Sequence, residues 1–363
     1  MENQDILDFA NMVFSMEYGS IDFEELYPKA YAKQCCHIPV HHMIEEGGKI
    51  QALLDIYPVT LNLSGSDMSI RAAYIGTVAV HPRHRGKGYM TELMQRAERD
   101  AREKGFDLML VDGDRHRYRS YGFEKAGVKY SFNVRLGNIW HRCRELYPKE
   151  ALCAPKYSFE ELDEDSAYIP ALFDLYRRRN VTARTRENFF LCLKSNLAAT
   201  YAVLADGHLA GYINLSGDEK NILEFALEEC ALIPRMLCDF MEGMGLNEIG
   251  ISVGMDETEK LEQLEGASDY YNLSMSHQMK LLKPDKVLEF LTAWKEKYDT
   301  RVINVDKIKQ LWREVETDDR EKISLFTTSR CFMEMQKGEN SVLKGIPSDW
   351  LPLPFFLPDG DAF

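Results

Sequence analysis

The sequence predicts a mixed α+β protein built from more than one domain. Its 363 residues exceed what one ordinary hydrophobic core holds, so two or three domains are expected. Stretches with strand character alternate with stretches whose apolar residues recur at helical spacing. After a loop rich in Pro and Lys at residues 148–156, a similar order of elements begins again. These observations predict two related α+β domains and a C-terminal segment.

The first 140 residues contain a clear order of elements. Apolar residues at helical spacing predict an opening helix over 5–16. Two long strands are predicted at 49–63 and 69–80, joined by the turn sequence SGSD. A helix that ends near Gly105 and a buried strand over 106–112 follow. The apolar stripe of that helix consists of Met90, Leu93, Met94, Ala97 and Ala101.

The later elements are predicted in the same way, but without a glycine-rich loop. Helices are predicted at 167–178, 231–244, 286–297 and 305–315, and strands at 200–205, 209–215, 248–254 and 322–335. The chain then ends in DWLPLPFFLPDGDAF, where the spacing of the prolines prevents regular structure. The aromatic residues of this tail predict that it docks on the protein.

The composition argues against several classes of protein. A formal net charge of −14 disfavours general nucleic-acid binding and favours a cationic small-molecule partner. No long uncharged apolar run is present and the start MENQDILDF has no cationic region, so we expect no membrane span and no secretory signal. The eight cysteines form no CxxC and no zinc spacing. We therefore expect reduced thiols, a cytoplasmic location and no metal.

The stretch VHPRHRGKGYM, residues 80–90, gathers cationic residues and glycines in this acidic chain. It lies between a predicted strand and a predicted helix, where backbone N–H groups bind phosphate oxygens. Gly86 and Gly88 permit close approach of the backbone, and Arg85 and Lys87 carry side chains that can reach phosphates. The stretch therefore predicts a site for a diphosphate. Neither the P-loop pattern nor the GxGxxG fingerprint fits it.

This stretch resembles motif A of the GCN5-related N-acetyltransferases (the GNAT superfamily), [Q/R]-x-x-G-x-[G/A], whose amides hold the pyrophosphate of acetyl-CoA. Two registers are possible. Residues 83–88 match the pattern completely, whereas residues 85–90 place Met90 at the final small position. We prefer the second register, because superfamily members commonly have the Arg or Gln three residues after a proline, and Arg85 lies three after Pro82.

A second superfamily pattern, Y-x-x-x-G-F, matches Tyr118-Arg119-Ser120-Tyr121-Gly122-Phe123. The resemblance implies that Tyr118 is the general acid that protonates the CoA thiolate; the alternative is a tyrosine of the core. It also implies that backbone groups of the strand edge at 78–80 contact the thioester and pantetheine. Asp112 and Asp114 are possible bases, although carboxylates in this position are usually helix caps. The implied acetyl-CoA site consists of Val78, Ala79, Val80, Arg85, Gly86, Lys87, Gly88, Tyr89, Met90, Thr91, Gly113 and Asp114.

The three-part layout is similar to that of the enhanced-intracellular-survival (Eis) acetyltransferases. That resemblance implies tandem GNAT-fold domains with mixed central sheets flanked by helices. It predicts a catalytic domain over 1–145, a second GNAT-like domain without the CoA motif over 146–275, and a short sterol-carrier-protein-like α/β domain over 276–363. Eis enzymes end in an aromatic residue whose terminal carboxylate acts as a base. This chain ends in Phe363, which is thereby a second candidate catalytic residue, with an ordinary packed terminus as the alternative.

The sequence leads to an expected function. We expect an N-acetyltransferase that uses acetyl-CoA and a cationic amine: an aminoglycoside, a polyamine, or a peptide or protein lysine. The Eis resemblance also implies a homo-oligomer, with a hexamer as one form. Two alternatives stay open at this stage: a non-catalytic acyl-CoA-binding or regulatory module, and an enzyme that uses a longer acyl donor.

Overall fold

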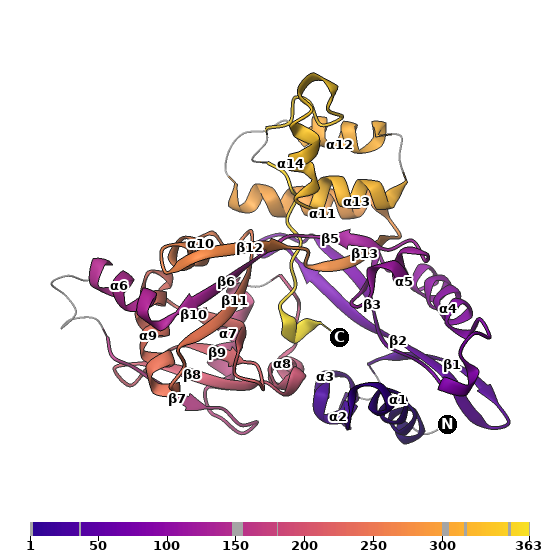
Figure 1. The fold of residues 1–363 in the computed structure, drawn as a ribbon, viewed down its shortest axis with the longest axis horizontal. Coiled ribbons are helices and arrows are strands. Elements are labelled where there is room, and N and C mark those ends of the chain that lie inside the picture. The colour runs from indigo at the N-terminus through magenta and orange to yellow at the C-terminus, as the bar shows by residue number, and fades with distance from the viewer. Residues whose placement is uncertain are drawn as a thin grey trace.

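The computed structural model describes residues 3–35, 38–146, 155–179, 181–299, 305–315, 318–347 and 350–362. Two mixed β-sheets lie side by side, and a group of helices lies above their junction (Figure 1). We call each sheet with its covering helices a lobe. This mixed α+β architecture confirms the predicted fold class of tandem GNAT-fold domains. No helix among the described residues is both long enough and apolar enough to cross a membrane.

The first lobe is formed mainly by the N-terminal elements. These are α1 Asn3–Tyr18, α2 Phe23–Leu26, α3 Pro28–Tyr31, β1 Val40–Glu46, β2 Lys49–Asn62, β3 Ser69–Val80, the 3-10 turn η1 Pro82–His84, α4 Tyr89–Glu103, β4 Leu108–Val111, α5 Arg115–Arg119 and β5 Glu124–Ala126. The predicted helices and strands of this region are confirmed. Helix α4 packs its apolar stripe on one face of the sheet, and α1 to α3 pack on the other.

The second lobe repeats this plan. Its elements are β6 Lys129–Arg135, α6 Leu136–Leu146, β7 Tyr157–Glu161, α7 Ile169–Arg179, α8 Arg186–Lys194, η2 Ser195–Leu197, β8 Ala199–Ala205, β9 His208–Leu215, β10 Asn221–Leu227, η3 Cys230–Leu232, α9 Ile233–Met244, β11 Glu248–Gly254, α10 Thr258–Glu265 and β12 Ser268–Ser274. Helices α6, α9 and α10 cover one face, and α7 and α8 cover the other. The loop predicted at 148–156 lies mostly outside the described residues.

Each sheet contains one strand that the chain order would place with another part of the protein. The first sheet has the order β1-β2-β3-β4-β13-β5, in which β13 is His277–Leu281, and the second has the order β12-β6-β11-β10-β9-β8-β7. Strand β13 thus follows the second lobe in the chain but lies inside the first sheet, between β4 and β5. Strand β6 lies inside the second sheet, between β11 and β12. The domain boundaries at 145 and 275 stay a prediction, and each sheet takes one strand from across them.

The C-terminal segment differs from the predicted small α/β domain. After β13 its described elements are α11 Pro284–Tyr298, α12 Val305–Glu314, α13 Asp319–Thr327, α14 Arg330–Met335, and the turns η4 Gly338–Asn340 and η5 Asp359–Asp361. The strand predicted at 322–335 is wrong: this stretch is helical. Asp318 caps α13 by accepting from the Glu321 amide over 3.0 Å, and Ile323 and Phe326 are fully buried one turn apart.

The tail beyond residue 350 is irregular and docked, as predicted. It descends from the helices and runs between the two lobes (Figure 1). The Leu353 amide donates to the Phe326 carbonyl over 2.7 Å. The apolar side chains of this segment that are at most 1% exposed are Trp350, Leu351, Leu353, Phe355 and Leu357. The final residue of the chain lies outside the described residues.

Candidate active site

The loop between β3 and α4 presents backbone amides at the start of a long helix. Gly86 and Gly88 have φ angles of +82° and +83°, a conformation that side chains other than glycine rarely adopt. No side chain caps the helix at Gly88, and a Cβ atom at either glycine would meet open space. The first amides of α4 are therefore open to a ligand at the positive end of the helix dipole.

Strands β3 and β4 separate next to this loop. They pair in parallel from Ala72 and Leu108 to Ile75 and Val111, and β3 then continues to Val80 without β4 beside it. A bulge with Thr77 at φ +47° interrupts the pairing of β3 with β2 at the same level. The separation leaves the backbone edge of β3 near Val78 unpaired on one side. Such an edge can form hydrogen bonds with an extended ligand.

A buried polar cluster lies beneath this bulge. The Tyr31 hydroxyl donates to Asp55 Oδ2 over 2.5 Å and is also hydrogen-bonded to Thr77. On the other side, His41 Nδ1 lies 2.6 Å from Asp55 Oδ1. Burial and the charge of Asp55 raise the pKa of Tyr31 well above its ordinary value, so this hydroxyl stays a donor. The cluster ties α3, β1 and β2 to the irregular part of β3.

The amides and the free strand edge face one cavity of about 540 Å³. Of the residues predicted to bind acetyl-CoA, those that line it are Val78, Val80, Arg85, Gly86, Gly88, Tyr89, Met90 and Thr91. Those that do not line it are Ala79, Lys87, Gly113 and Asp114. Arg83 does not line it either, which supports the register that begins at Arg85.

Six further residues of the cavity were not identified from sequence. They are Val13, Phe14, Glu17, Tyr18, His84 and Arg117. Four of them lie on α1, whose position over β3 depends on contacts between residues far apart in the chain. Arg117 precedes Tyr118 in the second motif, and this adjacency was the one local signal available for it.

The cations of the loop are paired with carboxylates in this structure. Arg85 Nη2 lies 3.1 Å from Glu17, and Lys87 Nζ lies 3.7 Å from Glu46. Glu46 also accepts a hydrogen bond from the Tyr89 hydroxyl, and this bond is the largest of the causes that lower the pKa of its carboxyl. All these pairs are exposed to solvent, so each contributes little and can exchange for a phosphate.

Tyr118 lies on α5 and is 5% exposed. It does not line the cavity itself, but its neighbour Arg117 does. Its ring packs edge-on against Phe123, and a Cβ atom at Gly113 would come within 3.2 Å of it. Burial raises the pKa of Tyr118 above its ordinary value, although the neighbouring Arg117 lowers it in part. Tyr118 is therefore protonated at neutral pH, as a general acid must be before it reacts.

The two aspartates after β4 have different surroundings. Asp114 caps α5, where its side chain accepts from the His116 amide over 2.9 Å. Asp112 accepts from the Tyr74 hydroxyl over 2.6 Å and lies 3.1 Å from Nδ1 of His277, which β13 brings into the first sheet. Burial alone would raise the pKa of Asp112, but the hydrogen bonds with His277 and Tyr74 hold it below its usual value.

The tail is held between the lobes by buried charges. Arg184 of the second lobe lies between Glu224 and Asp361, with nitrogen–oxygen distances of 2.6 Å and 2.8 Å. From the first lobe, Lys29 Nζ donates to the carbonyls of Gly360 and Ala362 over 2.8 Å and 2.5 Å. Burial lowers the pKa of Lys29 to about 8. The candidate base Phe363 lies outside the described residues, one position beyond this anchored segment.

Comparison with known proteins identifies the domain. Residues 1–126, about a third of the chain, match the family model described as acetyltransferase (GNAT) domain. The N-terminal region therefore carries a GNAT acetyltransferase domain, and the predictions of GNAT membership and of an N-acetyltransferase are confirmed. Such a domain uses an acyl-CoA cosubstrate. No curated protein sequence matches the chain.

Solved structures share the fold across both lobes. A protein of unknown function from Enterococcus faecalis V583, described as a probable N-acyltransferase, is 13% identical with a TM-score of 0.58, covering 79% of this chain and 72% of that one. A GCN5-related N-acetyltransferase from Kribbella flavida is 15% identical with a TM-score of 0.57, and the match covers 79% of this chain and 72% of that one. Eis1 from Mycobacterium abscessus is 14% identical with a TM-score of 0.52, and the match covers 79% of this chain and 74% of that one. At these identities the likeness shows the fold.

Proposed function

We propose that this protein transfers the acetyl group of acetyl-CoA to a primary amine of a cationic small molecule or lysine-like side chain. The observation that carries the proposal is the cavity of about 540 Å³ at the start of α4, where open amides and an unpaired edge of β3 face the same space. The amides near Gly86 and Gly88 hold the diphosphate. The edge at 78–80 pairs with the pantetheine and supports the thioester.

Proton transfers are assigned to two groups. The amine nitrogen attacks the thioester carbon, the carbon–sulfur bond of the tetrahedral intermediate breaks, and the thiolate takes the phenolic proton of Tyr118. The support for this role is that the raised pKa keeps Tyr118 protonated at neutral pH and that the adjacent Arg117 lines the cavity. The terminal carboxylate of Phe363 takes the proton of the attacking amine. Its support is the tail between the lobes, which Lys29 and Arg184 anchor within three residues of the terminus.

The acceptor is proposed from charge. A net charge of −14 attracts cationic molecules, which favours polyamines, aminoglycosides and lysine side chains over anionic acceptors. We further propose that the protein acts in the cytoplasm as a homo-oligomer, as the Eis resemblance implies. A hexamer is the form to be tested first.

The function is tested by measuring release of free CoA thiol from acetyl-CoA in the presence of spermidine, kanamycin or a lysine-containing peptide. We expect thiol release that requires one of these amines, together with the acetylated amine in the mass spectrum. Propionyl-CoA in the same assay tests the acyl preference. If acetyl-CoA binds but no amine in the panel causes release, the proposal fails and a non-catalytic acyl-CoA-binding module is supported.

A further inference from the structure

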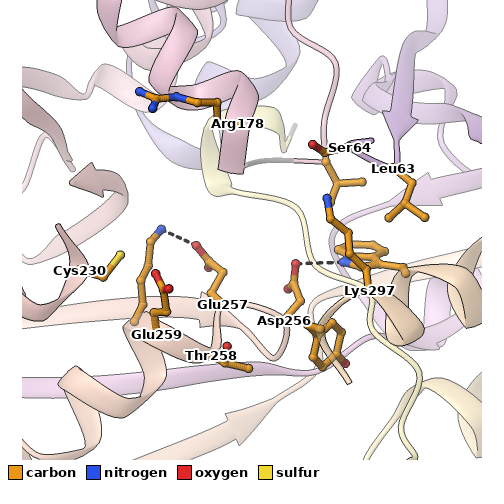
Figure 2. Close-up of a pocket in the computed structure, with 13 residues that line it drawn as sticks. Leu63, Ser64, Arg178, Cys230, Asp256, Glu257, Thr258, Glu259 and Lys297 are labelled. Carbon is orange, nitrogen blue, oxygen red and sulfur yellow. Dashed lines mark hydrogen bonds and ion pairs between the residues drawn. The ribbon is translucent and has the colours of Figure 1, made fainter. Parts of the chain in front are cut away.

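A second cavity, of about 360 Å³, lies where the second lobe meets α11 and the residues that follow β2 (Figure 2). Its walls come from the turn between β11 and α10, from η3 after β10, from α11, and from the residues that follow β2. In Figure 2, Asp256 and Glu257 project from the turn after β11 toward a space bordered on its other sides by Ser64, Lys297 and Arg178. The GNAT reaction proposed above makes no use of this cavity.

The position of this cavity corresponds to that of the proposed active site in the first lobe. Strands β10 and β11 pair in parallel only at Asn221–Gly250 and Ile222–Ile251 and then separate, as β3 and β4 do in the first sheet. Asp256 follows β11 closely, as Asp112 follows β4. The second lobe therefore retains the crevice between separated parallel strands, without the glycine loop for a diphosphate. A crevice of this kind is a common place for small ligands.

Asp256 is a partly buried carboxyl that has no cation as an ion-pair partner among the described residues. Its Oδ2 atom accepts from the Trp294 indole Nε1 over 2.9 Å. The nearest cation on its own segment, Lys260, is hydrogen-bonded to Glu257 and to the Phe225 carbonyl. Burial, with the adjacent charge of Glu257, raises the pKa of Asp256 to about 6. An ionised Asp256 thus lacks a cationic partner, although it is removed from part of the solvent, and a charge in such surroundings favours one.

The cavity offers two further features that suit an ammonium group. The Tyr298 hydroxyl is buried and has no hydrogen-bond partner among the described residues, so it can accept an N–H group. Trp294 and Tyr298 provide aromatic walls next to the carboxyl, and aromatic faces attract organic cations. The other cations of the lining, Arg178 and Lys297, would repel a second positive charge. A ligand with one ammonium group and an apolar body therefore fits better than a polyamine.

We propose that this cavity is a second ligand site, which binds the ammonium group of a small monoamine between Asp256, Trp294 and Tyr298. The site is independent of the acetyl-CoA cavity. The amine is held there and not acetylated, because the second lobe has no diphosphate loop to bring a thioester to it.

The test uses the full-length protein without acetyl-CoA and the probe 2-phenylethylamine, with 2-phenylethanol as the uncharged control. The chain has four tryptophans, and the indole N–H signal of Trp294 is assigned in ¹H–¹⁵N spectra with Trp294→Phe. We expect the amine, and not the alcohol, to shift this signal in a saturable way at pH 7.5. In Asp256→Asn the affinity should fall at least tenfold, and in Asp112→Asn, the matched change in the first lobe, it should be unchanged.

A second measurement varies the pH. The charged groups that line the cavity with Asp256 are Glu257, Glu259, Lys260, Arg178 and Lys297, with Tyr298 as a neutral phenol. With a pKa of about 6, roughly a tenth of Asp256 is ionised at pH 5 and nearly all at pH 7.5, so the affinity should fall about tenfold between pH 7.5 and pH 5. The proposal is overturned if the alcohol binds as well as the amine, or if Asp256→Asn binds the amine as wild type does. The proposal is also overturned if the amine no longer shifts the Trp294 signal in Asp112→Asn, because the amine would then bind in the first lobe.

Discussion

Arg184 and Asp361 form an ion pair with a distance of 2.8 Å, and their side chains are only 1% and 5% exposed. Arg184 belongs to the second lobe, and Asp361 lies two residues from the end of the chain. The same guanidinium is bound by Glu224, and the ring of Tyr176 packs over it at 4.5 Å. The pair therefore holds the described end of the tail, around Asp361, against the second lobe.

Replacing Arg184 by Met should destabilise the protein strongly. The substitution leaves Glu224 and Asp361 buried without a cation, which costs about 3–5 kcal/mol of unfolding free energy. Urea unfolding followed by circular dichroism measures this loss. The matched control is Arg135→Met, because Arg135 forms an exposed pair with Glu248 at 4.0 Å and should contribute less than about 1 kcal/mol. Equal effects of the two changes would contradict the structural role of Arg184.

Removing Phe363 alone should lower turnover and leave acetyl-CoA affinity nearly unchanged. The deletion keeps Asp361 on Arg184, but it turns the Ala362 carbonyl that Lys29 binds into the terminal carboxylate, one residue and up to about 3.8 Å back from its former place. A deletion of the last three residues would also break the Arg184 pair and confuse stability with catalysis. We expect a fall in kcat of at least tenfold in the thiol-release assay. Full activity of this variant would rule out the terminal carboxylate as the base.

Tyr118→Phe should reduce kcat about 100-fold while the dissociation constant of acetyl-CoA stays within about twofold, since only the proton donor is lost. Calorimetry gives the affinity and thiol release gives the rate. Tyr121→Phe is the control: its hydroxyl lies 3.2 Å from Thr91 Oγ1 at the exposed start of α4 and should matter much less for turnover. If Tyr118→Phe retains full kcat, its phenol serves the core and not the reaction.

Gly88→Val should weaken acetyl-CoA binding far more than Arg83→Ala. Valine at a φ of +83° is strained by roughly 1–2 kcal/mol, and the displaced backbone no longer aims the first amides of α4 at the cavity. Arg83 is exposed and does not line the cavity. We expect at least a tenfold loss of affinity for Gly88→Val and less than threefold for Arg83→Ala, measured by calorimetry. The reverse order would favour the register that begins at Arg83.

Lys29 should make stability depend on pH in the alkaline range. Its pKa is about 8 in the folded protein, whereas the ordinary pKa of a lysine, which applies to the unfolded chain, is 10.5, so the unfolded state binds more protons between these values. The free energy of unfolding therefore gains with rising pH across this window, by up to about 3 kcal/mol from this residue. Lys29→Met removes the gain. The difference between wild type and variant, measured by urea unfolding from pH 7.5 to 10.5, isolates Lys29 from the tyrosines that titrate nearby.

Much of the first lobe could be predicted because its signals are local. The alternating stretches of β2 and β3, the glycines at 86 and 88 and the apolar stripe of α4 each specify their own conformation within a few residues. The glycine motif at residues 85–90 also predicted most of the cavity residues in the loop and at the start of α4. Tyr118 was predicted as the general acid because its motif is also short and continuous in the chain, and this role stays a prediction.

The remaining parts depend on contacts that no local pattern contains. His277 lies next to Asp112 only because β13 is part of the first sheet, although it follows the whole second lobe in the chain. Helix α1 contributes to the cavity through its packing over β3. The stretch 322–335 contains β-branched and aromatic residues, which favour strands. It is helical because one face of the helix is buried in the core and Asp318 caps its N-terminus.

The position of β13 in the first sheet has a consequence for synthesis of the chain. Strand β13 lies between β4 and β5, so the first sheet has a gap between these two strands until residue 281 has been made. At ordinary ribosomal rates, the stretch from β5 to the end of β13 takes roughly 8–30 seconds to translate. During that time the inner edges of β4 and β5 are exposed on the nascent polypeptide. We therefore expect chaperones to bind at this gap and prematurely terminated chains to aggregate.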